Sequence, residues 1–259
     1  MSGVDSVWLR AVARAGVFTV LGAGLLIVAP ISWVGASGLG RAETVGVARS
    51  LSATLTSALG AVTLASLPAL LTAVSLSELL GPSGRERGRR FFELAAATPA
   101  AVYGLWGATW LGGVAPRVSA TLVLAAMALP TITLLAMRAF SKVPEGLRET
   151  SAALGASPWH TAWRGVVPAA WRGLVSAAGL GFLRAIGESL AVSMVTTRVD
   201  EPLAARIVRL STLTHTEREW QTLSALTLVL LLLTASVAML SRRSTRPDRS
   251  DASAPGASP

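Results

Sequence analysis

Two opposite charges lie inside an apolar segment of the chain, at residues 173–197. The segment has the length and composition of a membrane span, yet it contains Arg184 and Glu188. An ionised side chain at the centre of a bilayer costs about 2.5–3.5 kcal/mol on insertion scales, so two in one span need a reason. A spacing of four residues places them one turn apart on one helix face, where they can pair. Because a guanidinium offers a planar fork of donors that suits tetrahedral oxyanions, we expect Arg184, Glu188 and Ser189 to line a substrate pathway.

A structural ion pair that holds a helix bundle together is the alternative interpretation of the same two charges. Small residues recur beside them at intervals of four, which would let another helix approach closely. These residues are Ala177, Gly181, Ala185, Ser189 and Ser193.

The composition places the chain in a membrane. Of its 259 residues, 52% are hydrophobic and 14% are charged, and the mean hydropathy is +0.57. The chain has no cysteine and two histidines, His160 and His215, which argues against disulfides, thiolate sites and metal catalysis. The net charge of +9 comes from basic residues between apolar runs, a pattern that indicates membrane topology rather than nucleic-acid binding.

Six stretches are long and apolar enough for membrane-spanning helices, which need about 20 residues each. They cover residues 15–40, 50–77, 94–116, 118–137, 173–197 and 221–241. The first is too long for the apolar region of a signal peptide, so we predict that it is retained as a span. The sequence therefore predicts an all-α membrane protein with six transmembrane helices.

The basic residues predict the orientation of these spans. The segments on the side of the termini hold more than twice as many Lys and Arg residues as the segments on the other side. By the positive-inside rule both termini lie in the cytoplasm of a plasma (inner) membrane protein. The expected organisation is a segment with the first span at 1–44, a transmembrane domain at 45–241, and a disordered cytoplasmic tail at 242–259.

The longest cytoplasmic segment, residues 138–172, contains apolar residues among its charges. Pro144 and Pro158 divide it, and the run GASP at residues 155–158 predicts a bend between two short helices. Such a segment could present a compact knob to a partner, although an ordinary membrane-surface loop remains the alternative.

The same segment resembles the EAA loop of binding-protein-dependent ABC importer permeases, whose transmembrane domain is of type I. It reads VPEGLRETSAALGASPW from residue 143, and VVP follows at 166–168. Glu149, Gly155 and Pro168 stand at the family's spacings, whereas Thr150 and Ser151 replace its usual alanines and Gly165 replaces a usual isoleucine. The resemblance implies that a cytoplasmic ATPase docks on this loop. The loop residues that we expect to couple to it are Glu149, Ala153, Gly155, Ala156 and Pro168.

Two further segments are similar to the phosphate-type permeases of this family. Residues 184–192 read RAIGESLAV, which looks like the family's RALGETMAV, and residues 100–107 read AAVYGLWG, which looks like PSVVYGLWG. Leu129-Pro130 and the SLSE run at 75–78 are similar as well. The resemblance covers about residues 50–240 and implies a role in transport for Arg184 and Glu188, although the external segment after the first span is shorter than in many members.

The chain lacks the sequence that would let it hydrolyse ATP. A phosphate-binding P-loop needs Gly-Lys-Ser/Thr, and the one lysine, Lys142, follows Ser141. We therefore predict a transport subunit that is not an enzyme and binds no cofactor, with ATP and Mg on a partner ATPase. The resemblance implies a second permease subunit, two ATPase subunits and an external phosphate-binding protein as partners within the lipid membrane.

The sequence leaves three other functions open. The cargo could be sulfate, molybdate or another oxyanion, because one arginine separates tetrahedral anions poorly. An ion-coupled secondary transporter could use Arg184 and Glu188 as a charge relay, and a regulatory membrane subunit could have lost transport. The EAA-like loop argues against the second, and the two retained charges argue against the third.

Overall fold

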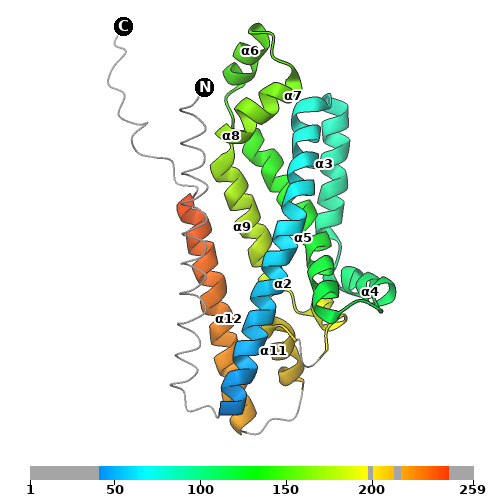
Figure 1. The fold of residues 1–259 in the computed structure, drawn as a ribbon, viewed down its shortest axis with the longest axis vertical. Helices are drawn as coiled ribbons and strands as arrows, with labels where there is room; N and C mark the ends of the chain where they lie inside the picture. Colours follow the sequence, from blue (N-terminus) through cyan, green and yellow to red (C-terminus); the bar gives the residue numbers. More distant parts are fainter. Residues whose placement is uncertain (1–40, 198–200, 213–216, 245–259) are drawn as a thin grey trace, which may run out of the picture.

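The computed structural model describes residues 41–197, 201–212 and 217–244, and every regular element among them is a helix (Figure 1). The predicted first span at 15–40, the residues after 244 and His215 lie outside this part of the chain. The all-helical prediction is confirmed for the residues that the structure describes.

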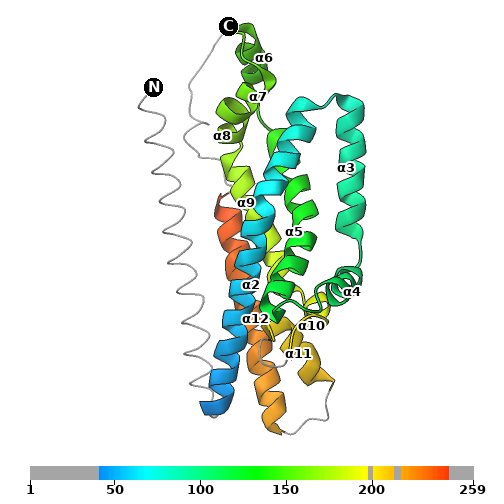
Figure 2. The ribbon, with the colours of Figure 1, turned by 45° about the vertical axis from the view of Figure 1, so that its right-hand side comes forward.

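Two long helices form the centre of the bundle. Helix α2 spans Arg41–Val74 and continues into a π-helical turn, η1, at Ser75–Leu79, and α5 spans Pro116–Phe140. The two lie side by side in both views (Figures 1 and 2). Alanines let α2 approach its neighbours closely, because a helix of small residues brings backbones together. Those almost fully buried are Ala53, Ala58, Ala61, Ala65, Ala69 and Ala73.

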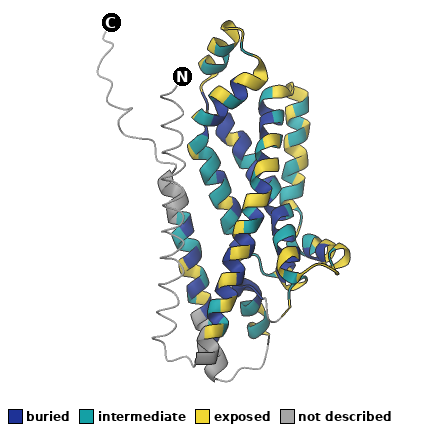
Figure 3. Ribbon diagram, in the orientation of Figure 1, coloured by how far each residue is buried: buried dark blue, intermediate teal, exposed yellow. Residues whose placement is uncertain are grey.

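Helices α9 (Trp171–Gly187) and α12 (Glu217–Ser244) complete the bundle against α2 and α5. A Cβ atom on Gly181 of α9 would lie 2.7 Å from the side chain of Ile132 on α5, so only glycine allows this approach. Figure 3 shows buried positions along α2, α5 and α12. Helix α12 extends beyond the predicted boundary at 241, so the first three residues of the predicted tail are helical.

The predicted third span, residues 94–116, is not one helix. The structure places Pro82–Ala97 in α3 and Ala100–Trp110 in α4, with a break at Thr98 and Pro99. Proline lacks an N–H donor and disfavours helical geometry in the residue before it, and Thr98 is accordingly extended, with ψ 130°. In Figure 2, α3 runs beside α2 and α5, whereas α4 turns away from it.

Helix α3 also contains the four arginines between residues 85 and 90, which stand between the predicted spans at 50–77 and 94–116. Ion pairs along the helix stabilise it, since Glu86 accepts hydrogen bonds from Arg89 and Arg90 at 2.8–2.9 Å. These two guanidinium groups, Arg89 first, lower the pKa of the Glu86 carboxyl from 4.5 to about 2. None of the residues of α3 is fully buried.

A knob of short helices stands at one end of the molecule, beyond α2 and α3 (Figure 1). Its elements are α6 (Glu145–Ala153), α7 (Pro158–Thr161), the π-helical turn η2 (Ala162–Val166) and α8 (Val167–Ala169). The predicted pair of short helices with a bend between them is confirmed. We call α6 to α8 the coupling knob.

Two more short helices follow α9: α10 (Leu190–Ser193), which packs on α4, and α11 (Leu203–Ser211), nearer the end of the bundle opposite the coupling knob (Figure 2). Helix α11 lies between the predicted spans at 173–197 and 221–241, and it packs on α2 and α12. The backbone N–H of Leu203 donates to the Thr54 hydroxyl of α2 at 2.8 Å, and Glu201 pairs with Arg209 at 2.9 Å.

Two described helices are long and apolar enough to cross a membrane, Val45–Leu79 and Pro116–Phe140. A third span results if Pro158–Ala169 and Trp171–Gly187, bent by 73° at their junction, count as one. A shorter apolar stretch, Leu226–Ala238, lies in α12. Six spans and the cytoplasmic position of the termini remain predictions.

Candidate functional site

The apolar segment that contains Arg184 and Glu188 is broken at Glu188. Helix α9 ends at Gly187, and Glu188 takes an extended conformation with φ −79° and ψ 119°. Its Oε1 atom accepts a hydrogen bond from the backbone N–H of Ala191 at 3.0 Å, which satisfies one of the donors exposed at the start of α10. The segment therefore consists of two helices with a polar junction between them.

This break overturns the predicted ion pair between Arg184 and Glu188. The prediction assumed a continuous helix, whereas the chain leaves the helix before Glu188 and turns its carboxylate toward α10. Arg184 instead donates through Nη2 to the carbonyl oxygen of Ala96, at a long 3.4 Å. That carbonyl belongs to the last turn of α3, where unpaired carbonyls and the helix dipole attract a cation.

The arrangement leaves Arg184 exposed on the described chain, while Glu188 and Ser189 are half-buried. The ends of α3 and α9 and the start of α10 converge here, about midway along the molecule (Figures 1 and 2). Among the described residues no carboxylate pairs with Arg184. The bond to Ala96 orients the guanidinium group, but it is long and occupies one of the N–H donors. Such a group in a membrane protein belongs beside water, a ligand or another subunit, because lipid would not solvate it.

The predicted stripe of small residues is confirmed only in its first half. Ala177, Gly181 and Ala185 are buried, and Gly181 contacts α5. Ser189 and Ser193 lie beyond the break, so they do not continue the same helix face.

Helix α4 packs against α10, the helix that follows the polar junction. A Cβ atom on Gly104 would lie 2.7 Å from the backbone Cα of Ala191, so α4 packs directly against α10. Tyr103 is anchored by its hydroxyl, which donates to the Ala95 carbonyl at 2.8 Å, and Trp106 is exposed. Tyr103 is thus held against α3 by its hydroxyl, whereas Trp106 lies on the exposed surface of α4.

The bend in the coupling knob is a Schellman motif centred on Gly155. Gly155 has φ 76°, its N–H donates to the Ala152 carbonyl, and the N–H of Ala156 donates to the Ser151 carbonyl. Only glycine enters this left-handed region without strain. The next helix begins at once, because the Ser157 hydroxyl accepts from the N–H of His160 and Pro158 occupies the first turn.

The predicted coupling residues lie along this bend and at its exit. Glu149, Ala153 and Gly155 are exposed, Ala156 is half-buried, and Pro168 lies in α8 just before the chain turns into α9. Beside them Leu154 is 82% exposed and Trp159 is 51% exposed. A groove of about 660 Å³ follows the bend and includes His160 and Arg164 in its lining. The knob therefore presents apolar and small residues outward beside charged ones.

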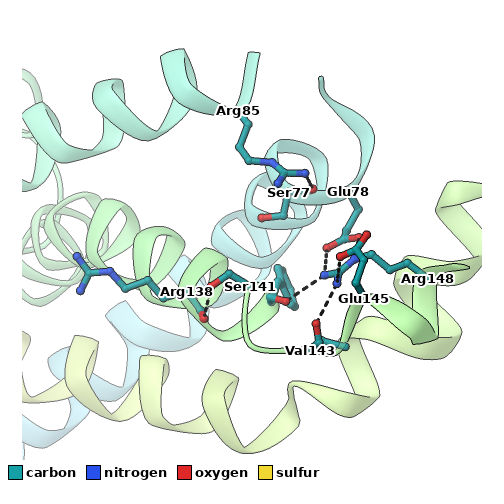
Figure 4. Close-up of polar contacts among 9 residues, drawn as sticks. Ser77, Glu78, Arg85, Arg138, Ser141, Val143, Glu145 and Arg148 are labelled. Atoms are coloured by element: carbon teal, nitrogen blue, oxygen red, sulfur yellow. Dashed lines mark hydrogen bonds and ion pairs between the residues drawn. The ribbon is translucent and has the colours of Figure 1, made fainter. Parts of the chain in front are cut away.

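One polar cluster, centred on Arg148 of α6, is not among the sites predicted from the sequence (Figure 4). Its Nε and Nη2 atoms donate to the two carboxylate oxygens of Glu78 at 2.9 Å each. This carboxylate holds the pKa of Arg148 above its usual value. Glu78 immediately follows a predicted span and Arg148 lies in the loop motif, but 70 positions separate them and no local signal pairs them.

Solved structures with the same architecture define the class of protein. The chain is similar to a chain of the MetNI methionine ABC transporter, which is described in inward-facing conformations, with a TM-score of 0.66 and 18% identity over 80% of this chain and 100% of that one. It is also similar to a chain of a bacterial ABC transporter involved in alginate import, with a TM-score of 0.61 and 13% identity over 93% and 99% of the two chains. The fold is that of a type I ABC importer permease.

The chain belongs to the family of binding-protein-dependent transport system inner membrane components, whose pattern it matches over residues 61–246. The membership confirms the resemblance found in the sequence. Permeases of this family are transport components of the inner membrane, and a separate subunit supplies their ATPase activity.

Two curated relatives are similar over part of their length. A probable ABC transporter permease protein, YqgH, of Bacillus subtilis is 35% identical over 139 residues, which cover 49% of this chain and 45% of the relative. The phosphate transport system permease protein PstC of Pasteurella multocida is 28% identical over 152 residues, 48% of each chain. The chain thus spans about half the length of the curated relatives it matches.

Proposed function

We propose that this chain is a permease subunit of an ATP-driven importer that moves inorganic phosphate across the plasma membrane. The observation that carries the proposal is the exposed guanidinium of Arg184 at a helix break midway along the bundle. The similarity to a permease named for phosphate transport supports the cargo.

The electrostatics of the junction suit an oxyanion that passes through. A phosphate anion can accept paired hydrogen bonds from a guanidinium, which gives both charge neutralisation and orientation. The single long bond to Ala96 leaves most of the donors of Arg184 available for this purpose. Glu188, held by α10, adds a negative charge nearby that disfavours permanent capture of an anion and so favours release.

The proposed assembly pairs the chain with a second permease subunit, two ATPase subunits and an external phosphate-binding protein. ATP and Mg would be bound by the ATPases alone. The exposed outer surface of the coupling knob is suited to an ATPase groove, because Leu154 and Trp159 offer apolar area and Gly155 fixes the shape of the bend.

Transport in this proposal proceeds by alternating access. ATP binding draws the ATPases together and displaces the coupling knobs, and the attached helices tilt so that the site near Arg184 opens to one side and then to the other. The break at Glu188 supports such a motion, because α9 and α10 can reorient without breaking a continuous helix.

Sulfate or molybdate is the remaining alternative cargo, since the same guanidinium would bind either. The secondary-transporter alternative is not retained, because the chain belongs to the ABC importer family and its two charges do not form the relay.

The test is uptake of radiolabelled phosphate into proteoliposomes that contain this chain with its partner permease, ATPase and binding protein. We expect ATP-dependent uptake that survives excess sulfate. Replacement of Arg184 by alanine should abolish uptake while the complex still assembles, because the pathway loses its cationic donor group.

The matched control is Arg172→Ala, which removes another exposed arginine from the start of the same helix. Uptake should persist in this variant. Competition by sulfate would reassign the cargo, and normal uptake by an assembled Arg184→Ala complex would show that Arg184 has only a structural role.

A further inference from the structure

The guanidinium of Arg148 uses all five of its N–H donors. Besides the two bonds to Glu78, it donates to the backbone oxygens of Phe140 and Val143 at 3.0 Å and to the carboxylate of Glu145 at 3.2 Å. Figure 4 shows these groups converging on one side chain. An arginine used this completely is held in one position, because any rotation breaks several bonds at once.

These five bonds join three parts of the molecule. Glu78 lies in η1, which continues α2; Phe140 ends α5, and Val143 follows it; Arg148 and Glu145 lie in α6 of the coupling knob. One side chain thus connects the knob to the ends of both central helices.

The central pair is well shielded from solvent. The Glu78 side chain is 7% exposed and that of Arg148 is 20% exposed, whereas Glu145 is 73% exposed. A shielded, doubly hydrogen-bonded pair resists separation much more than a surface pair, and removing one partner leaves an uncompensated charge.

The turn that contains Glu78 is itself unusual. The N–H of Leu80 donates to the Ser75 carbonyl at 3.0 Å, five residues back, so α2 ends in a π-helical turn. Such turns occur frequently at functional sites. The adjacent Ser77 carbonyl accepts a hydrogen bond from Arg85, which ties the same turn to α3.

We propose that the Glu78–Arg148 pair is the link through which displacement of the coupling knob is transmitted to α2 and α5. Glu78 and Arg148 are positioning residues in this role, since they lie in the knob region, away from the proposed cargo site at Arg184. The inference rests on the proposed docking of an ATPase on the knob, but it does not depend on which anion is carried.

Because the chain has no cysteine, the link can be tested directly with two introduced spin labels. Gly146 in α6 and Leu71 in α2 are both exposed, and the distance between labels at these positions reports how the knob moves relative to α2. In the assembled complex with its ATPase, we expect one narrow distance distribution that is the same with and without ATP. In Glu78→Gln the distribution should broaden or shift when ATP binds, because the knob then moves without α2.

The functional readout is the number of phosphate ions moved per ATP hydrolysed. In Glu78→Gln we expect ATP hydrolysis to continue and this ratio to fall by at least about fivefold, the lower end of ordinary coupling between sites. Arg148→Lys keeps the charge but cannot supply five donors, so the ratio should fall in it as well. Glu145→Gln, which changes only the exposed partner, is the matched control and should keep the wild-type ratio.

Unchanged distance distributions and an unchanged ratio in assembled Glu78→Gln would overturn the inference. If that variant does not assemble, the same two results in Arg148→Lys decide the question. Loss of ATPase attachment in both variants would also overturn the inference. The Glu78–Arg148 pair would then maintain the shape of the docking surface and would not transmit the motion of the knob. Failure of the wild type to carry phosphate would reject only the proposed cargo, because the spin-label distances are measured without cargo.

Discussion

Two arginines of this chain lie in contrasting environments. Arg148 has every donor satisfied and lies in a shielded cluster. Arg184 is exposed and makes one long bond to a carbonyl oxygen. N–H donors that make no bond within the protein are available to a ligand. This contrast supports the proposal that Arg184, and not Arg148, contacts the cargo.

A prediction at the residue scale concerns the bend of the coupling knob. Gly155→Ala should destabilise the chain by about 1–2 kcal/mol, the usual cost of placing a side chain in the left-handed region. A Cβ atom there would meet nothing within 4 Å, so the cost is conformational and not steric. Unfolding of the purified protein in detergent, followed by circular dichroism, measures it.

Gly146→Ala is the control for this substitution, because Gly146 is also in open space but lies in the first turns of α6. It should be neutral or slightly stabilising, since alanine favours helix. Equal stability of the two variants would contradict the assigned role of Gly155.

At the scale of elements, a few polar and close-packed contacts attach the short helices to the bundle. Helix α11 is attached to α2 by the bond from the Leu203 N–H to the Thr54 hydroxyl, two residues 149 positions apart, and by a second bond from Arg206 to the Ser50 hydroxyl at 3.3 Å. Helix α10 is fixed to α4 by the close approach of Gly104 to Ala191. Each contact holds a short helix against a neighbouring helix, and each can be tested by one substitution.

Thr54→Val should cost about 1–3 kcal/mol, because it leaves the buried N–H of Leu203 without an acceptor. Thr56→Val is the matched control: Thr56 is exposed and its hydroxyl bonds only within its own helix. Thermal unfolding in detergent compares the two, and a loss as large in Thr56→Val would refute the assigned contact.

Gly104→Ala should destabilise the packing of α4 on α10 by about 1–3 kcal/mol, the usual cost of overpacking. The added atom would meet backbone, which cannot rotate away as a flexible side chain can. Gly113→Ala provides the comparison, since a Cβ atom there meets nothing within 4 Å. The same unfolding measurement applies, and wild-type stability of Gly104→Ala would show that α4 and α10 are free to separate.

At the scale of the whole molecule, the coupling knob and α11 lie at opposite ends of the bundle (Figure 1). The predicted orientation places the knob in the cytoplasm and α11 outside. This follows from the distribution of Lys and Arg residues along the chain, and the proposed docking of an ATPase on the knob requires the same orientation.

The absence of cysteine allows a direct test of this orientation. In intact cells, a membrane-impermeant maleimide should label Ser211→Cys in α11 but not Gly146→Cys in α6, and both positions are exposed. Permeabilised cells should show labelling of both variants. Labelling of Gly146→Cys alone in intact cells would reverse the orientation.

The sequence alone determined the features that depend on neighbouring residues or on composition. The bend at Gly155 was predictable, because its glycine, capping serine and proline act within a few positions. The family was recognisable for the same reason, since its motifs are contiguous. The break after Gly187 also had local signals, a glycine followed by polar Glu188 and Ser189, but the apolar character of the segment outweighed them in the prediction.

Only the tertiary structure decided which distant groups meet. The pairing of Glu78 with Arg148, the attachment of α11 to Thr54 and the turn of Glu188 toward α10 depend on how helices pack. A charge pattern gives the number of possible ion pairs but not their geometry, because a pair forms only where backbone positions bring the two groups within hydrogen-bonding distance. The polar residues were therefore visible in the sequence, and their partners were not.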